Sequence, residues 1–438
     1  MKTPVLIITV FLLGSALSVS ANPNQVQFDA AMGHPLLLAD KTQTDYLKVG
    51  LTGFEMPSEK DRAPVNISIV IDKSGSMSGE KIEKAKEAAI MVIRYLNPRD
   101  IISVTAYDST VKVILPATEV SDIGGIIRKI RHIEAGGSTA LYEGVRQGAE
   151  EVKKYLSENR VNRIVLLSDG LANVGPDSPD DLGALGRKLI KKGISVTTIG
   201  LGENFNEDLM TKLAFNSDGN HYFAENPRDL EKIFDKEFRR ALSVVAQEIQ
   251  IEIRCRDGIR PVRLLGREGT IKDRNVSVFI NQLYSKAEKF VILEVEIPPK
   301  PAGTTQKVAE IEVSYSNLKT HTTDRFKSEI EVNFSDSKAL VEERANNQVM
   351  ADVIELLAVE RNEIAIQFRD KGDIDKARKV FLDNSSFLKS NASRYNSQRL
   401  SEYSDQILKE SEKLEADQWN MSRKQIRQSQ YQRSTQQE

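Results

Sequence analysis

The chain has 438 residues, of which 40% are hydrophobic and 28% are charged, and its formal net charge is −2. This length exceeds what one hydrophobic core supports, so the composition predicts two or three globular domains rather than a disordered or fibrous protein. Lys and Arg form no concentrated cluster, and phosphate binding requires clustered cations. Nucleic acid is therefore excluded as an expected partner.

Residues 1–21 are typical of an export signal. Lys2 precedes an apolar run at residues 5–17, and the small residues at 19–21 suit a cleavage site. We expect the mature chain to begin near Asn22 and to be periplasmic or secreted. No later stretch approaches the roughly 18 apolar residues of a spanning helix, so no transmembrane segment is expected after signal removal.

A β-rich region is expected on both sides of a different kind of domain. Within residues 22–60, the stretch 46–54 alternates, with Leu47, Val49 and Leu51 on one face, as in a half-buried antiparallel strand. Residues 243–336 contain six further alternating runs, at 249–255, 262–265, 276–280, 291–297, 308–315 and 330–334. Six strands predict a β-sandwich. We expect the early strand to join that sandwich; docking on the edge of the neighbouring sheet is the alternative.

Residues 61–242 alternate short apolar strands with amphipathic helices. Strands are expected at 67–71, 101–107, 111–115, 164–167, 194–199 and 221–223, and helices at 79–96, 123–130, 141–155, 181–191, 207–215 and 228–238. This order predicts a doubly wound α/β domain. If the early strand belongs to the sandwich, the α/β domain is an insertion in it.

The last part of the chain is predicted to be helical. Residues 337–418 carry three apolar stripes at helical spacing, which predict a hairpin or small bundle. Gly372 ends the first stripe, and Asp373 can cap the second helix. Residues 419–438 are mostly Gln, Arg and Ser, with too little apolar surface to fold alone, so we expect a disordered tail.

Polar side chains lie directly after two of the expected strands and in one loop that opens a helix. Asp72, Ser74 and Ser76 alternate directly after the buried strand at 67–71, Thr139 lies in a Gly-Gly-Ser-Thr loop that opens a helix, and Asp169 follows the strand at 164–167. Open α/β sheets bind ligands at the carboxyl ends of their strands. We therefore expect these five side chains to share one site.

Their donor atoms are all oxygens, which suits a hard cation. Mg²⁺ is expected, with Mn²⁺ or Ca²⁺ as alternatives, in near-octahedral geometry at about 2.1 Å. Ser74, Ser76 and Thr139 are predicted to be direct ligands, and Asp72 and Asp169 to bind directly or through waters. Because the hydroxyls are neutral, the metal keeps an open position that an acidic side chain of a partner could fill.

Other interpretations of these loops remain. The hydroxyls could simply cap helices. Lys73 and Asp108 are interpreted as surface and turn residues, and Met77 and Asn173 as the rim of the site. The stretch GSMSGEK is too short between its glycines for a phosphate loop, so ATP hydrolysis is not expected.

The three loops resemble the metal-ion-dependent adhesion site of von Willebrand factor type A domains, and the resemblance covers about residues 63–241. It implies a Rossmann-like fold. The order of signal, A domain, β-rich segment and helical tail is similar to bacterial secreted relatives of the inter-alpha-trypsin inhibitor heavy chains and the calcium-activated chloride channel regulators. The chain lacks the full N-terminal β domain of the former and the H-E-x-x-H metalloprotease motif of the latter.

Two classes of function follow. The first is an exported, metal-dependent protein-binding module for adhesion or scaffolding, whose partner presents an acidic residue. The second is a metal-dependent enzyme or a regulatory subunit of an envelope complex. Apart from Lys73, the three loops contain no His, Cys or Lys, so a general base is lacking, and we expect no enzymatic activity.

Overall fold

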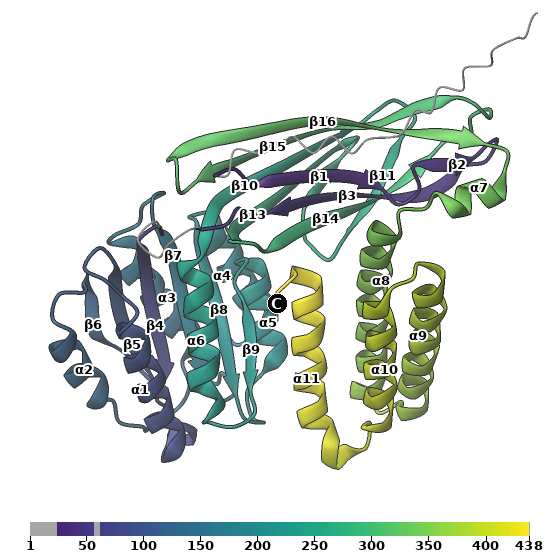
Figure 1. Ribbon diagram of the computed structural model, residues 1–438. Helices are drawn as coiled ribbons and strands as arrows, with labels where there is room; N and C mark the ends of the chain where they lie inside the picture. The colour runs from purple at the N-terminus through teal and green to yellow at the C-terminus, as the bar shows by residue number, and fades with distance from the viewer. Residues whose placement is uncertain (1–23, 57–61, 438) are drawn as a thin grey trace, which may run out of the picture.

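The computed structural model describes residues 24–56 and 62–437. A β-sandwich lies across the top in Figure 1, an α/β domain lies below it at one side, and a helical domain lies below it at the other. The export signal predicted at residues 1–21 falls outside the described residues. Across the part of the chain that is described, no helix is long and apolar enough to cross a membrane.

The sheet of the α/β domain has the strand order β6-β5-β4-β7-β8-β9. Its strands are β4 (Val65–Asp72), β5 (Ile101–Tyr107), β6 (Val111–Glu119), β7 (Val161–Ser168), β8 (Ile194–Leu201) and β9 (His221–Ala224). All pairs are parallel except β5 with β6. Every residue of β4, β5, β7 and β8 is buried, which explains their nearly continuous apolar sequences.

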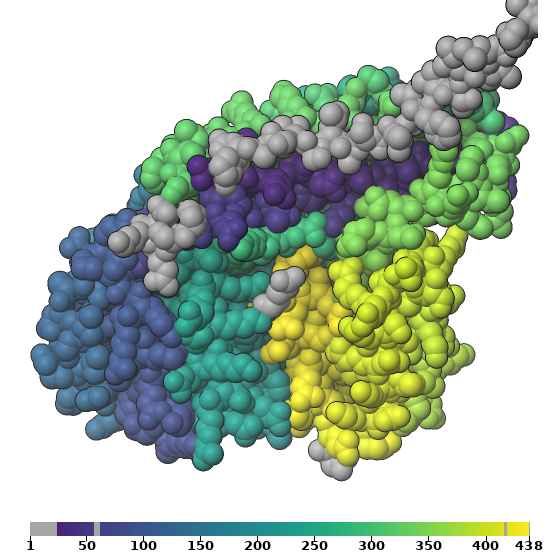
Figure 2. Space-filling model, viewed as in Figure 1, coloured from purple at the N-terminus to yellow at the C-terminus, as the bar shows by residue number. Residues whose placement is uncertain are grey.

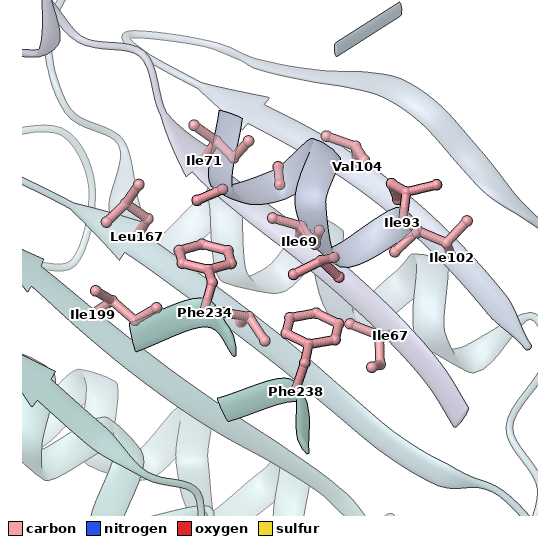
Figure 3. Packing of buried hydrophobic residues seen from close by; sticks show 14 of the residues in the cluster. Ile67, Ile69, Ile71, Ile93, Ile102, Val104, Leu167, Ile199, Phe234 and Phe238 are labelled. Carbon is pink, nitrogen blue, oxygen red and sulfur yellow. The ribbon is translucent and has the colours of Figure 1, made fainter. Parts of the chain in front are cut away.

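Helices cover both faces of this sheet. The helices are α1 (Glu80–Ile93), α2 (Ile123–Arg131), α3 (Leu141–Lys153), α4 (Pro179–Ile190), α5 (Glu207–Asn216) and α6 (Asp229–Leu242). Phe234 and Phe238 of α6 pack on one face with Ile69 (Figure 3), whereas the next residue, Val70, joins the core under α3 on the other face. The predicted doubly wound α/β class is confirmed.

The sandwich contains two sheets, of orders β1-β3-β14-β11 and β12-β13-β10-β15-β16-β2. Its strands are β1 (Gln27–Met32), β2 (Leu36–Leu38), β3 (Gln43–Thr52), β10 (Val244–Cys255), β11 (Arg260–Leu265), β12 (Thr270–Lys272), β13 (Asn275–Tyr284), β14 (Glu288–Ile297), β15 (Thr305–Asn317) and β16 (Thr322–Ser335). All ten residues of β3 pair with β14. The early strand therefore lies in the sandwich, and the α/β domain is inserted between β3 and β10.

A buried polar cluster joins the sandwich to the α/β domain. Arg163 of β7 is fully buried and forms an ion pair with Glu237 of α6 at 2.5 Å. Its guanidinium also donates to the Tyr284 hydroxyl of β13 at 2.7 Å and to the side-chain oxygen of Gln282. Tyr284 is part of the hydrophobic core of the α/β domain. The two domains thus share one desolvated boundary.

The helical domain contains α7 (Lys338–Glu343), α8 (Asn347–Asp370), α9 (Ile374–Arg394), α10 (Gln398–Glu412) and α11 (Ala416–Thr435). Helices α8, α9 and α10 pack on one another around Phe381, Leu388 and Tyr403, which are fully buried. These residues belong to the apolar stripes that predicted a helical bundle.

The prediction of a disordered tail at residues 419–438 is wrong for the described residues, because α11 extends to Thr435. This helix contacts α5 and β9 on one side and α8 on the other (Figure 1), and its surface meets the α/β domain in Figure 2. Ile426 and Tyr431 are buried, and the Gln437 side chain bonds both backbone groups of His221 on the edge strand β9. Composition gave the wrong prediction for this segment because the contacts that stabilise α11 come from elements far away in the chain.

Candidate metal site

The first loop of the predicted site follows β4, at the end of the sheet opposite the sandwich (Figure 1). The Asp72 carboxylate accepts hydrogen bonds from the backbone N–H of Ser74 at 2.8 Å and from the Ser168 hydroxyl at 2.7 Å. The loop then forms the 3₁₀ helix η2 (Gly75–Met77). Met77 is fully buried in the core, so its predicted position at the rim is wrong.

Backbone hydrogen bonds join the three loops. The Gly75 N–H donates to the Gly137 carbonyl at 2.9 Å, and the Gly136 N–H donates to the Lys73 carbonyl at 2.7 Å. Thr139 is held by Asn173, whose side-chain oxygen accepts from the Thr139 N–H at 2.8 Å. Asn173 therefore connects the second loop to the third, and the relative positions of the loops are fixed.

The predicted ligands converge at this junction. The hydroxyls of Ser74 and Ser76 lie 3.1 Å apart, and Ser76 donates to Asp169 Oδ1 at 2.7 Å. A Cβ atom at Gly170 would lie 3.4 Å from both the Ser76 and the Thr139 hydroxyl oxygens. The glycine thus leaves open space beside those hydroxyls, and the structure brings all five predicted side chains to one place.

Both carboxylates of the cluster are removed from water. Asp72 and Asp169 are fully buried. Burial raises the pKa of Asp72 above its usual value, and the neighbouring charge of Asp169 acts in the same direction. Lys81 of α1 forms an ion pair with Asp169, and Lys73 forms one with Asp108.

Two neighbours of the site were not identified from the sequence. The signal for Lys81 in the sequence is its place in the first turn of the helix that follows the first loop. Ser168 precedes Asp169 at the end of β7, and its side chain supports Asp72 at 2.7 Å. Lys73 and Asp108, interpreted as surface and turn residues, pair with each other.

The helix-capping alternative is wrong for these hydroxyls. The N-cap residues of α1 and α3 are Gly79 and Ala140. Ser74 precedes η2 but makes no side-chain capping hydrogen bond. The hydroxyls are therefore available for another role.

The donor set fits a hard divalent cation. Within residues 24–56 and 62–437, no group of three or more His, Cys, Asp or Glu is placed to hold a metal. A metal at this site would consequently depend on the three hydroxyls together with two carboxylates. Such oxygen-only donors are those that Mg²⁺ and Ca²⁺ prefer.

The site opens into a cleft of about 840 Å³. The α/β domain contributes Ser76, Thr139, Gly170, Leu171, Asn173, Glu203, Asn204, Phe205 and Glu207, and the helical domain contributes Arg369, Asp370, Trp419, Asn420, Arg423 and Lys424. Ser76 and Asn173 are exposed. A ligand entering the cleft could therefore reach the proposed metal position.

Residues 66–236 match the family model described as von Willebrand factor type A domain. This stretch is a von Willebrand factor type A domain. The match confirms the predicted domain family. A domains are generally protein-interaction modules, and they commonly bind a divalent metal at their adhesion site.

Curated relatives match parts of this chain. An uncharacterized protein of Synechocystis sp., sll0103, is 33% identical over 183 residues, covering 42% of this chain and 43% of that protein. The uncharacterized protein YfbK of Escherichia coli is 29% identical over 48% of this chain and 37% of that protein. Human inter-alpha-trypsin inhibitor heavy chain H3 is 27% identical over 39% of this chain and 20% of that protein. The chain spans less than half the length of these relatives.

Solved structures resemble more of the fold. A von Willebrand factor type A protein from Catenulispora acidiphila has a TM-score of 0.72 at 16% identity, covering 88% of this chain and 91% of that chain. The ArnB paralog VWA2 from Sulfolobus acidocaldarius has a TM-score of 0.65 at 18% identity, covering 92% and 98%. At these identities the similarity establishes the fold alone, but it extends well beyond the A domain.

Proposed function

We propose that the A domain binds one divalent cation through Asp72, Ser74, Ser76, Thr139 and Asp169 and holds an acidic side chain of a partner protein on that cation, without catalysis. Mg²⁺ is the proposed metal, with Mn²⁺ and Ca²⁺ as alternatives. The observation that carries the proposal is the convergence of three neutral hydroxyls and two buried carboxylates beside an open cleft.

The ligand set favours an anionic partner group. Two carboxylates formally neutralise a divalent cation, but Asp72 is already engaged by the Ser74 N–H and the Ser168 hydroxyl. A cation that relies mainly on hydroxyl ligands remains electrophilic and gains from a further carboxylate. Ser76 is exposed toward the cleft, so that carboxylate can approach from outside.

Several features support binding rather than chemistry. The described residues that line the cleft include no His or Cys. Two of its cations, Arg423 and Lys424, are held in ion pairs with carboxylates, so neither is a free general base. In this proposal the export signal at residues 1–21 directs the protein to the periplasm or the medium, where the partner is met.

Calorimetry with Mg²⁺ and Mn²⁺ tests the metal site. We expect one cation per chain, and we expect Asp72→Ala and Thr139→Ala to weaken binding by at least the roughly 10- to 100-fold associated with supporting groups of metal sites. Ser138→Ala is the matched control, because Ser138 is exposed and adjacent to Thr139 but outside the cluster. Equal affinity in wild type and Asp72→Ala would refute the site.

Partner capture tests the second half of the proposal. Envelope or culture extract is passed over immobilised wild type, Thr139→Ala and Ser138→Ala, each with Mg²⁺ and with chelator, and circular dichroism checks that each variant is folded. We expect the capture of one protein to require both Thr139 and the metal. Capture that ignores both would show that partner binding uses another surface.

A further inference from the structure

The cleft at the proposed metal position has a second wall, which the A domain does not provide. This wall consists of the C-terminal end of α8, with Arg369 and Asp370, and the beginning of α11, with Trp419 and Asn420. In Figure 1 these helix ends lie at the same end of the molecule as the carboxyl ends of β4 and β8. The helical domain therefore borders the approach to the metal.

Charged contacts fix this wall against the A domain. The Arg423 guanidinium bonds Asp370 of α8 at 2.9 Å and Asp208 of α5 at 2.6 Å, and it also pairs with Glu207. Lys424 bonds Glu207 at 2.8 Å. Glu207 and Asp208 form the first turn of α5, the helix that follows the loop at 203–206 on the opposite side of the cleft. One arginine thus joins both walls.

Arg423 and Lys424 are paired within the protein, whereas Arg369 of the same wall can contact a ligand. Arg369 stacks on Trp419 with its guanidinium 5.1 Å from the ring centroid, and among the residues whose side chains the structure describes it has no carboxylate within ion-pair distance. Glu203 is the remaining acid of the cleft, and it is exposed at the rim. The charged residues that line the cleft balance, and a divalent cation would be balanced by Asp72 and Asp169. Arg369 donates one hydrogen bond, from Nε to the Leu414 carbonyl, so its guanidinium retains other donors for an incoming anion.

We propose that the helical domain is the second half of the partner-binding site, and that the occupant is an acidic, extended segment of a partner protein. This inference rests on the function proposed above. One carboxylate of the segment binds the metal, and residues beside it lie along Arg369 and Asn420. A flat protein face cannot reach a metal beside which a second domain stands, whereas a loop or tail can enter between the walls.

A peptide probe tests the occupant directly. A phage-displayed library of short random peptides with a fixed central aspartate is selected on the full mature chain with Mg²⁺. The enriched peptide is synthesised, and its affinity is measured by fluorescence polarisation. Asn420 is exposed and uncharged, so a negative or a positive charge can be placed at this position without disturbing the core.

We expect Asn420→Glu to weaken the enriched peptide by roughly five- to tenfold and Asn420→Lys to tighten it, because a charge beside a ligand carboxylate acts with the sign of that charge. Arg369→Gln should weaken the peptide while leaving Mg²⁺ affinity unchanged. The matched control is Gln425→Glu, which adds the same charge at an exposed position of α11 outside the cleft and should have no effect.

The outcomes separate the two proposals. The two-walled site is the metal position together with the wall that the helical domain provides. It would be overturned if magnesium-dependent peptides bound wild type, both Asn420 variants and Arg369→Gln equally. The proposed function would then still stand. Failure to select any peptide that depends on Mg²⁺ and on Thr139 would overturn the proposed function and this inference with it. Opposite effects of Asn420→Glu and Asn420→Lys, absent in Gln425→Glu, support the two-walled site.

Discussion

Replacing Lys81 with methionine is expected to tighten Mg²⁺ binding at the candidate site. The Lys81 ammonium contacts Asp169 Oδ2, while Ser76 donates to Asp169 Oδ1 at 2.7 Å. A cation that binds Asp169 must displace this ammonium or experience its repulsion. Methionine keeps much of the length and the apolar stem of lysine but removes the charge.

The size of the effect follows from the exposure of the pair. Two unit charges 4 Å apart interact by about 4 kcal/mol at an effective dielectric constant of 20 and by about 1 kcal/mol in water. The Lys81 side chain is 28% exposed although Asp169 is fully buried, so solvent screening brings the value toward the lower limit. We expect a gain of about 1 kcal/mol, which is roughly fivefold in the dissociation constant.

Calorimetric titration of chelator-treated protein with Mg²⁺ measures this gain. Lys81→Arg keeps the charge and should stay within about twofold of wild type. Lys84→Met is the control on the same helix, because Lys84 pairs with Glu87 rather than with the site. The gain should shrink as salt rises. Weaker binding by Lys81→Met would refute the reasoning and show that Lys81 positions Asp169 for the metal.

Three further predictions concern stability. Burial raises the pKa of Glu410 to about 7, so the stability that its protonated form contributes is present below pH 4.5 and is lost as the pH rises through 7. Glu410→Gln should therefore stabilise the protein by about 1–3 kcal/mol near pH 8 and not at pH 4.5, as measured by urea denaturation. Glu237→Ala should cost about 3–5 kcal/mol, because it removes the ion-pair partner of the buried Arg163, and an unchanged urea midpoint would contradict this. Arg423→Ala should speed hydrogen exchange in α11 and leave Mg²⁺ affinity unchanged, whereas slow exchange throughout α11 would show that apolar contacts alone hold the helix.

The strands of the α/β domain were predictable because burial on both faces leaves a nearly continuous apolar sequence. β4 and β7 are fully buried over their whole lengths and lie where those runs predicted them. β1, β2 and β12 were not predicted, and β2 has only three residues, too few for a periodic pattern. Residues of β12 are all exposed, and β1 is mostly exposed or half-buried, so neither carries a strong alternating pattern. These strands are defined by pairing with neighbours rather than by their own composition.

The meeting of the five candidate side chains was predictable from the sequence. Strand-end positions of a parallel sheet meet at one edge, so Asp72, Thr139 and Asp169 could be grouped from their places after strands and loops. Lys81 could not be assigned a role, because its contact with Asp169 depends on how the first turn of α1 is oriented toward β7. Met77 was misplaced for a similar reason, since the turn of η2 directs it into the core.

The sequence by itself determined the domain types and the five oxygen-bearing side chains, because periodicity, strand ends and loop composition are local properties. Only the tertiary structure decided that β3 pairs with β14, and that α11 is ordered between α8 and the A domain. Both depend on partners far away in the chain, as the contact between Arg423 and Glu207 illustrates. The second wall of the cleft was also decided by the tertiary structure alone. Its residues come to lie beside the metal position only through the packing of the helical domain, which no local sequence pattern encodes.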